Sequence, residues 1–130
     1  MNRVLLALAL TFYAASAMAE WVKVGDSVGV TPYADIATIR KNGDSVRMWV
    51  LDDYKNPVQM GSNPAFLSHK SQYEFDCKEG NLRELTGSFH SENMGKGLVI
   101  YFHDYKSPEW EAVPPDSIAE GEWKIACGKK

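Results

Sequence analysis

The sequence predicts an α+β fold in which a single antiparallel meander sheet of five to six strands carries a C-terminal helix tethered to it by a disulfide. Runs of alternating apolar and polar residues recur along the chain between glycine-containing turns, which indicates an antiparallel sheet. The apolar spacing becomes helical only near the C-terminus. The chain has two cysteines, and Cys77 ends a predicted strand while Cys127 ends the predicted helix.

The first 19 residues have the features of a signal peptide. Arg3 is their only charged residue, an apolar run extends over Val4 to Ala15, and an A-x-A cleavage site ends at Ala19. The run is shorter than the roughly 20 apolar residues of a membrane span. We therefore expect cleavage after Ala19, one domain over residues 20–130, no membrane span, and a location in the periplasm or outside the cell.

The composition excludes some classes of protein. The chain is 45% hydrophobic and 24% charged, which is typical of a folded globular domain. Its formal net charge is −3. A nucleic-acid-binding protein needs a basic surface that displaces counterions from phosphates, so we expect no nucleic-acid partner.

The first strands are predicted around an Asn42-Gly43 turn. A short apolar opening at Trp21 to Val24 precedes a strand over Tyr33 to Arg40, and the turn joins this strand to Ser45 to Leu51. Asn-Gly is the strongest short hairpin signal, because both of its residues accept a positive φ. The alternation along the second strand predicts that one of its faces packs in the core and that the other is partly exposed. The packed face carries Val46, Met48 and Val50, and the other face carries Ser45, Arg47 and Trp49.

The middle of the chain continues the meander after an irregular segment. Asp52 to Leu67 contains two prolines and a glycine, so we expect a long connection without regular structure. The last of the later runs is almost continuously apolar, which favours a central strand covered on both faces. The predicted strands are Ser68 to Cys77, Leu82 to His90 and Leu98 to Asp104.

The predicted helix begins after Ser117 and stops at Gly128. Ser117 and Glu120 form a capping box, and one helical face carries Ala119, Trp123, Ala126 and Cys127. A helix of about ten residues does not stand alone in water. An even number of cysteines in an exported domain indicates a disulfide. A bond between Cys77 and Cys127 would restrict the unfolded chain by about 4 kcal/mol and hold the helix on the sheet.

No pattern for catalysis or metal binding is present. His69, His90 and His103 lack the spacing of metal ligands, and the adjacent Asp52 and Asp53 point to opposite sides of a strand. Nucleophile motifs and phosphate-binding loops are absent from the sequence. We expect a protein that is not an enzyme and that has no metal and no cofactor.

Candidate binding residues come from a repeated motif and from one tryptophan. Asp-Tyr-Lys-x-Pro occurs at residues 53–57 and 104–108. A recognition role would use Tyr54, Lys55, Tyr105 and Lys106, whereas the alternative is ordinary turn chemistry, since Asp starts turns and Pro ends strands. Trp49 is a further candidate for contact with a partner, with the alternative that the helix covers its face.

Several motifs together resemble the surface-adhesin protein E family of Gram-negative bacteria. The resemblance covers nearly the whole chain after the signal peptide and implies a single antiparallel sheet, a disulfide-tethered helix, and adhesion to host matrix and plasma proteins. This sequence lacks the lipidated cysteine of a surface lipoprotein, so the periplasm is expected. The motifs, in order, are Met48-Trp49-Val50-Leu51-x-Asp53-Tyr54, Ser68-x-Lys70, Tyr73-Glu74-x-Asp76-Cys77, Met94-Gly95-x-Gly97, Trp110 with Val113-x-Pro115-x-Ser117, and Trp123-Lys124-x-Ala126-Cys127.

Three functional hypotheses follow from the sequence. The first is an adhesin-like binding protein with a protein partner. The second is an inhibitor of an enzyme such as lysozyme, which would use the segment Asp52 to Leu67. The third is a carrier of a small ligand such as haem.

An open sheet also leaves unpaired edges, so we expect a homodimer through Trp21 to Val24 or Tyr33 to Arg40. Charged side chains that could block such pairing are Lys23, Arg40 and Lys41.

Overall fold

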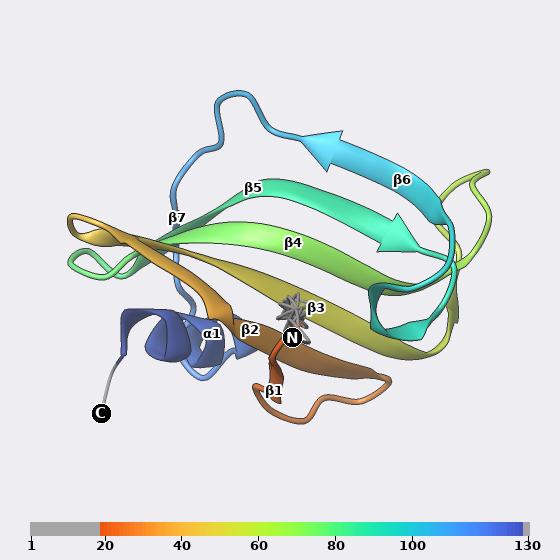
Figure 1. Ribbon diagram of the computed structural model, residues 1–130, viewed down its shortest axis with the longest axis horizontal. Coiled ribbons are helices and arrows are strands. Elements are labelled where there is room, and N and C mark those ends of the chain that lie inside the picture. Colours follow the sequence, from red (N-terminus) through yellow and green to blue (C-terminus); the bar gives the residue numbers. More distant parts are fainter. Residues whose placement is uncertain (1–18, 129–130) are drawn as a thin grey trace, which may run out of the picture.

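The computed structural model describes residues 19–128 as one antiparallel sheet with a single α-helix (Figure 1). The strands follow the order β1-β2-β3-β4-β5-β6, and a short β7 pairs with β5. The predicted fold class is therefore confirmed, with seven strands in the sheet. The elements are β1 (Trp21–Lys23), β2 (Val30–Asn42), β3 (Ser45–Val58), β4 (Phe66–Asp76), β5 (Asn81–His90), the 3₁₀ turn η1 (Asn93–Gly95), β6 (Val99–Asp104), β7 (Glu111–Ala112) and α1 (Ile118–Cys127).

The predicted signal peptide lies almost wholly outside the described residues, so cleavage after Ala19 stays a prediction. Within residues 19–128, no helix has the length and apolar character needed to cross a membrane.

The β2–β3 hairpin forms where the sequence predicts it. The turn residues, however, are Gly43 and Asp44 and not the predicted Asn42-Gly43, because Asn42 ends β2 and pairs with Ser45. Of the two turn residues only Gly43 has a positive φ, of 62°, which is the left-handed conformation that glycine adopts at little cost. Along β3 the predicted alternation is also confirmed, because Val46, Met48 and Val50 are buried and the residues between them are more exposed.

The prediction of a long irregular connection over Asp52 to Leu67 is wrong. β3 continues to Val58 and β4 begins at Phe66, so only residues 59–65 connect the two strands. The pairing between these strands shifts register between Asp53 and Val58, and such an irregularity accommodates Pro57 within a strand. The Asp53 carboxylate also accepts hydrogen bonds from the side-chain amide of Asn93 and the backbone N–H of Met94, which fix this end of β3.

The prediction that Leu98 to Asp104 is a central strand is also wrong. β6 pairs only with β5 and forms one edge of the sheet. The following chain crosses back to place β7 beside the other end of β5, where Asn81 pairs with Ala112, so within the described chain no strand covers the outer side of β6 (Figure 1). An apolar run alone does not distinguish a central strand from an exposed edge.

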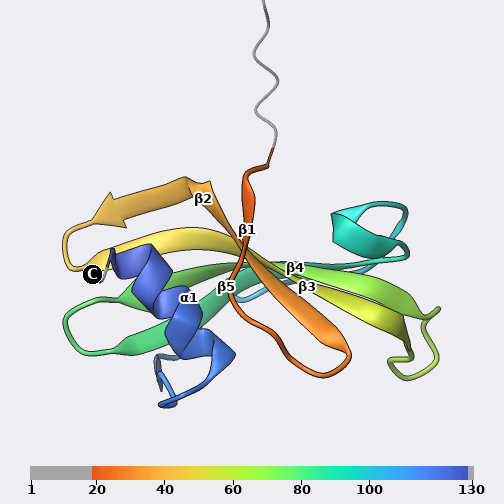
Figure 2. The ribbon, with the colours of Figure 1, turned by 90° about the horizontal axis from the view of Figure 1, so that it is seen from below.

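The hydrophobic core lies between α1 and one face of the sheet, whereas η1 lies on the opposite face (Figure 2). The buried Leu51 is on that opposite face, beside Gly95 of η1. The helix begins as predicted, since the Ser117 hydroxyl accepts a hydrogen bond from the Glu120 N–H at 3.1 Å. The core cluster contains Ala34, Val46, Met48, Val50, Phe75, Leu82 and Ala126.

Three contacts hold α1 on the sheet. Cys77 and Cys127 form the predicted disulfide, which is thereby confirmed. Beside it, the indole N–H of Trp123 donates to the Asp76 carbonyl at 3.0 Å. A Cβ atom at Gly121 would lie 2.9 Å from Val24 Cγ1, so the glycine that weakens the helix also lets it approach the segment after β1.

The other edge of the sheet is formed by two segments. β1 pairs with β2 only over Tyr33–Asp35. Beyond Asp35, the predicted edge strand Tyr33 to Arg40 has no second neighbour among the described strands. The predicted homodimer stays a prediction.

Candidate binding surface

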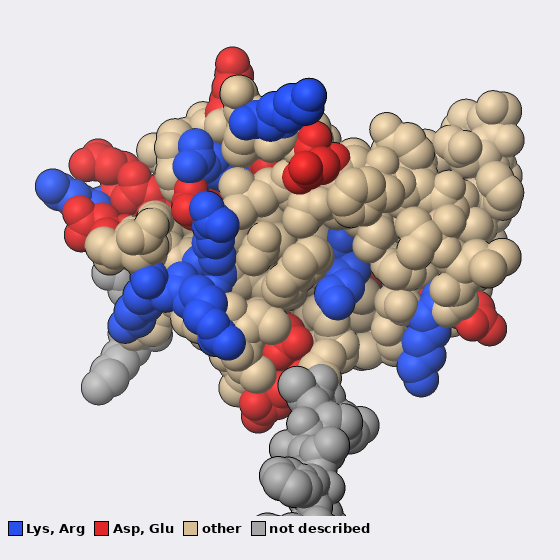
Figure 3. Space-filling model, turned by 45° about the horizontal axis from the view of Figure 1, so that its top comes forward, with Lys and Arg blue, Asp and Glu red and all other residues tan. Residues whose placement is uncertain are grey.

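An exposed apolar surface follows the edge strand β6 and its two ends, and we call it the β6 apolar edge. Five large apolar side chains there expose between 46% and 75% of their surface. Adjacent strand residues point to opposite faces, so the surface wraps around the edge of the sheet. Figure 3 shows that charged side chains gather in the left half of this view and are sparse toward the start of β6. The residues are Leu98, Val99, Tyr101, Phe102 and Tyr105.

The backbone of β6 adds a second property to this surface. Its pairing with β5 runs from Thr86–Asp104 to His90–Val99, and its outer side has no neighbouring strand within residues 19–128. Most exposed edge strands carry lysine, proline or a bulge that blocks further pairing. β6 contains neither lysine nor proline, although Ile100 is an extra residue that forms a bulge between Val99 and Tyr101. The edge is therefore apolar and lacks two of the three usual blocks to pairing with another extended chain.

The candidate residue Trp49 lies on the sheet face opposite the helix. Its neighbours Met48 and Val50 pack in the core with Ala126 of α1, and Trp49 points the other way. The ammonium group of Lys70 lies 4.9 Å from the Trp49 ring centroid and 5.9 Å from that of Trp21. Trp49 is thus half-buried beneath a lysine, and the alternative that the helix covers its face is wrong.

The structure does not bring the two copies of the repeated motif together. Asp53 pairs with Ser68, which pairs with His90, whereas Asp104 pairs with Thr86. Tyr54 is half-buried with its ring edge-on to Phe66, at 5.5 Å between centroids, and Lys55 is exposed.

In the second copy, Tyr105 and Lys106 are both exposed, and Tyr105 belongs to the β6 apolar edge. Of the predicted binding residues, Tyr105 is therefore the one that joins this surface. The roles of Trp49, Tyr54, Lys55, Tyr105 and Lys106 in binding stay predictions.

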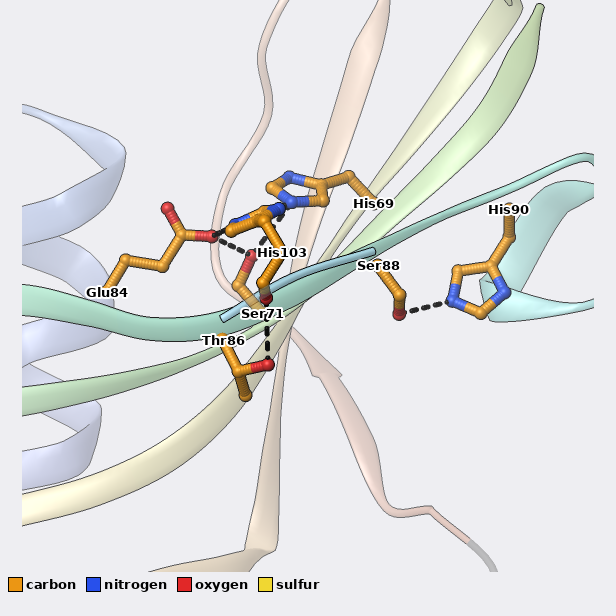
Figure 4. A network of polar contacts seen from close by, with 7 residues as sticks. All are labelled: His69, Ser71, Glu84, Thr86, Ser88, His90 and His103. Carbon is orange, nitrogen blue, oxygen red and sulfur yellow. Dashed lines mark hydrogen bonds and ion pairs between the residues drawn. The ribbon is translucent and has the colours of Figure 1, made fainter. Parts of the chain in front are cut away.

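Sequence reasoning missed a cluster of polar side chains on the helix-bearing face (Figure 4). The Glu84 Oε1 atom lies 2.7 Å from His103 Nε2 and 3.7 Å from His69 Nε2. The Ser71 hydroxyl lies 3.1 Å from His69 Nε2 and donates to Glu84 Oε1 at 3.0 Å. His69 and Ser71 belong to β4, Glu84 to β5 and His103 to β6. Their proximity therefore depends on the strand register and leaves no spacing motif in the sequence.

A bulge in β5 assembles this cluster. Tyr73 pairs with Glu84 and Gln72 pairs with Thr86, so Leu85 is an extra residue on β5. Without it, strict alternation would place Glu84 and Gly87 on opposite faces of the sheet. With the bulge, Glu84 and Gly87 lie on the same face of the sheet. His103 pairs with Gly87 and therefore lies on that face as well. A bulge carries no reliable sequence signal, which explains why the cluster was missed.

Gly87 leaves the space that the His103 ring occupies. A Cβ atom at this position would lie 2.5 Å from His103 Cε1 and 2.8 Å from Glu84 Oε1. Both distances are shorter than any ordinary contact. The backbone of His103 is fixed as well, because the Thr86 hydroxyl donates to its carbonyl at 3.0 Å (Figure 4).

The histidines have distinct electrostatic environments. Burial lowers the pKa of His69 to about 4, against the opposing effect of the Glu84 carboxylate. The ring of His69 is therefore neutral at physiological pH. His90 lies apart from the cluster, where its Nε2 contacts the Ser88 hydroxyl at 2.8 Å (Figure 4). Burial lowers its pKa also.

A buried acid lies beneath the helix. Glu122 of α1 is only 6% exposed. Burial raises the pKa of its carboxyl to about 8, with a further contribution from the charge of Asp52. Burial and the charge of Glu84 raise the pKa of Asp52 in turn. Burial on this face of the sheet therefore raises the pKa of both acids.

Two clefts meet at the segment after β6. They share Arg83, Tyr105, Ser107 and Pro108. The larger, of about 610 Å³, has a mainly basic wall that includes Arg47, Arg83 and Lys106. The smaller, of about 420 Å³, has an acidic wall of Glu84, Glu109 and Glu111.

Comparisons with known proteins agree with this architecture. A family model described as "Surface-adhesin protein E" matches residues 21–128. A solved structure of Haemophilus influenzae protein E in crystal form II is similar, with a TM-score of 0.63 and 16% sequence identity over 83% of this chain and 87% of that chain. Protein E from non-typeable Haemophilus influenzae gives a TM-score of 0.62 and 16% identity over 88% of this chain and 79% of that chain. No curated protein sequence matches the chain significantly.

Proposed function

Because the chain belongs to the surface-adhesin protein E family, we propose that it is an exported binding protein without catalytic activity whose ligand is another protein, such as a host matrix or plasma protein. The observation that carries this proposal is the β6 apolar edge. It combines exposed aromatic side chains with an unpaired strand backbone, and these two features are used together when a sheet binds an extended segment of another protein.

The geometry of the edge explains how such a segment is held. Backbone N–H and C=O groups on the outer side of β6 supply hydrogen bonds that do not depend on the ligand's sequence. Tyr101 and Phe102 point to opposite faces of the sheet, and their side-chain contacts depend on the sequence of the ligand. Buried aromatic side chains contribute most of the binding energy at protein interfaces. Phe102, at 61% exposure, is the most exposed aromatic side chain of the β6 apolar edge.

The structure supports this proposal better than the inhibitor hypothesis. An inhibitor would insert a protruding loop into its target enzyme, and the segment Asp52 to Leu67 was the candidate. Most of that segment belongs to β3 and β4, and only residues 59–65 remain as a loop.

A biosensor experiment tests the proposal. The purified, disulfide-bonded protein is immobilised and exposed to a panel of purified matrix and plasma proteins. We expect saturable binding of at least one, with affinity reduced about tenfold or more in Phe102→Lys, because the lysine removes an apolar anchor and guards the edge. Val28→Lys is the matched control, since Val28 is fully exposed far from β6 in the sequence and should not affect binding.

Two results would contradict the proposal. One is the absence of saturable binding to every protein in the panel. The other is equal binding by Phe102→Lys and Val28→Lys.

A further inference from the structure

We propose that His69, Glu84 and His103 form a binding site for a divalent transition-metal ion of the Zn²⁺ class. Their side chains each offer one ligand atom, and these atoms all lie within 4.8 Å of one another. Two imidazole nitrogens and one carboxylate oxygen are a donor set that Zn²⁺ uses in sites with an open fourth position. The site is independent of the β6 apolar edge, so its existence does not depend on the proposed function.

The distances are close to those that a metal ion requires. Zn²⁺ binds nitrogen and oxygen at about 2.0–2.2 Å in a tetrahedral arrangement, which separates neighbouring ligand atoms by about 3.4 Å. Glu84 Oε1 lies 2.7 Å from His103 Nε2 and 3.7 Å from His69 Nε2, so the observed separations lie on either side of that value. The ligand atoms of His69 and His103 also lie within 4.8 Å of each other.

The surroundings hold both rings in place. The His69 ring stacks on Phe89, with 4.0 Å between centroids and 7° between planes. His103 occupies the space above Gly87, and the Thr86 hydroxyl holds its backbone. Ligands that are already oriented lose little conformational freedom when a metal binds, which favours affinity.

The site is only partly buried, since the three side chains retain 14–21% of their exposure.

An acidic cleft provides the path for the ion. Glu84 lies in the wall of the smaller cleft together with Glu109 and Glu111. These carboxylates attract cations to the opening. Glu84 thus belongs both to this cleft and to the cluster with His69 and His103.

The test uses Zn²⁺ alone as the probe. The disulfide-bonded protein, without a histidine tag, is stripped with a chelator, dialysed and titrated with ZnCl₂ in a calorimeter. We expect one ion per chain. His69→Gln, Glu84→Gln and His103→Gln should each weaken binding by about a hundredfold, because each removes a ligand.

Two matched controls separate a metal site from a hydrogen-bond cluster. Ser71→Ala removes the hydroxyl that contacts His69 Nε2 and Glu84 Oε1. These are the atoms that would bind the ion, so the hydroxyl competes with the metal, and the variant should keep the affinity within about threefold because all three ligands remain. His90→Gln removes the histidine outside the cluster and should have as little effect. Equal binding by His69→Gln, His103→Gln and the unmodified protein would overturn the proposal, as would the absence of a one-to-one binding event.

A measurement on the unmodified protein keeps the proposal testable if a variant does not fold. NMR of the imidazole nitrogens during Zn²⁺ titration should shift the Nε2 resonances of His69 and His103 and leave those of His90 unchanged. Shifts confined to His90, or no shift at all, would show that the cluster does not bind the ion.

Discussion

The imidazole of His103 lies directly over Gly87, where a Cβ atom would come within 2.5 Å of the ring. Gly87→Ala should therefore displace His103 from Glu84 and destabilise the fold by about 1–3 kcal/mol, which is typical of overpacking. Urea denaturation measures the change. Ser88→Ala, at the next position of β5, is the control and should cost less. Equal stability of Gly87→Ala and the unmodified protein would show that His103 can move without cost.

Stability should fall as the pH rises through the titration of Glu122. Burial raises its pKa in the folded protein to about 8, above the ordinary value of 4.5 for a glutamate side chain. The folded protein therefore keeps a proton that the unfolded chain loses above about pH 4.5. Glu122 stabilises the fold fully below that pH, and its contribution declines by about 1.4 kcal/mol per pH unit until the pH passes 8.

Glu122→Gln isolates this effect, because glutamine does not ionise. The unfolding free energy of the variant minus that of the unmodified protein should increase between pH 5 and pH 8 and stay constant above that. Asp52→Asn should lower the pH at which the difference becomes constant, since the charge of Asp52 contributes to the raised pKa of Glu122. A difference that is the same at pH 5 and pH 8 would contradict the buried-acid interpretation.

Removing the disulfide should release the helix from the sheet. The paired Cys77→Ser and Cys127→Ser variant should lose about 4 kcal/mol of unfolding free energy, because closing a loop of 50 residues restricts the unfolded chain. Near-ultraviolet circular dichroism should report a change at Trp123, whose indole hydrogen bond depends on helix docking. Trp123→Phe, which keeps the disulfide, should lose only about 1 kcal/mol. If the paired variant lost less than about 1 kcal/mol of unfolding free energy, packing alone would be sufficient to hold the helix.

Self-association should occur through β6 when no other partner is present. An apolar strand edge without lysine or proline can pair with a second copy of itself, so we expect a homodimer at micromolar concentration in light scattering. Phe102→Lys should shift the population to monomer, and Val28→Lys should not. If the dimer persists in Phe102→Lys, the contact lies elsewhere, such as at β1 and the exposed part of β2.

Local patterns predicted most of the fold because they are set by neighbouring residues. The alternation along Val46 to Val50 follows from the geometry of a strand, and the start of α1 follows from the hydroxyl of Ser117. The position of Leu98 to Asp104 in the sheet was predicted wrongly, because it depends on where the following chain goes. An apolar strand at the edge of a sheet and an apolar strand at its centre have the same composition.

The histidine cluster depends on contacts that span three strands. His69 and Glu84 are neighbours only because Leu85 is an extra residue in β5. That bulge reverses the alternation on which a sequence-based prediction relies. The cluster could therefore be found only once the strand register was known.

The cysteine pair has a consequence for how the protein matures. With two cysteines in the chain, only one intramolecular pairing exists, so oxidation cannot trap an incorrect bridge. Cys127 follows every described strand in the sequence, so a chain exported N-terminus first would expose it after the strands. The sheet can thus complete its strand pairing before the bond closes. Maturation requires a thiol oxidant but no isomerase, and disulfide formation should be the last covalent step of folding.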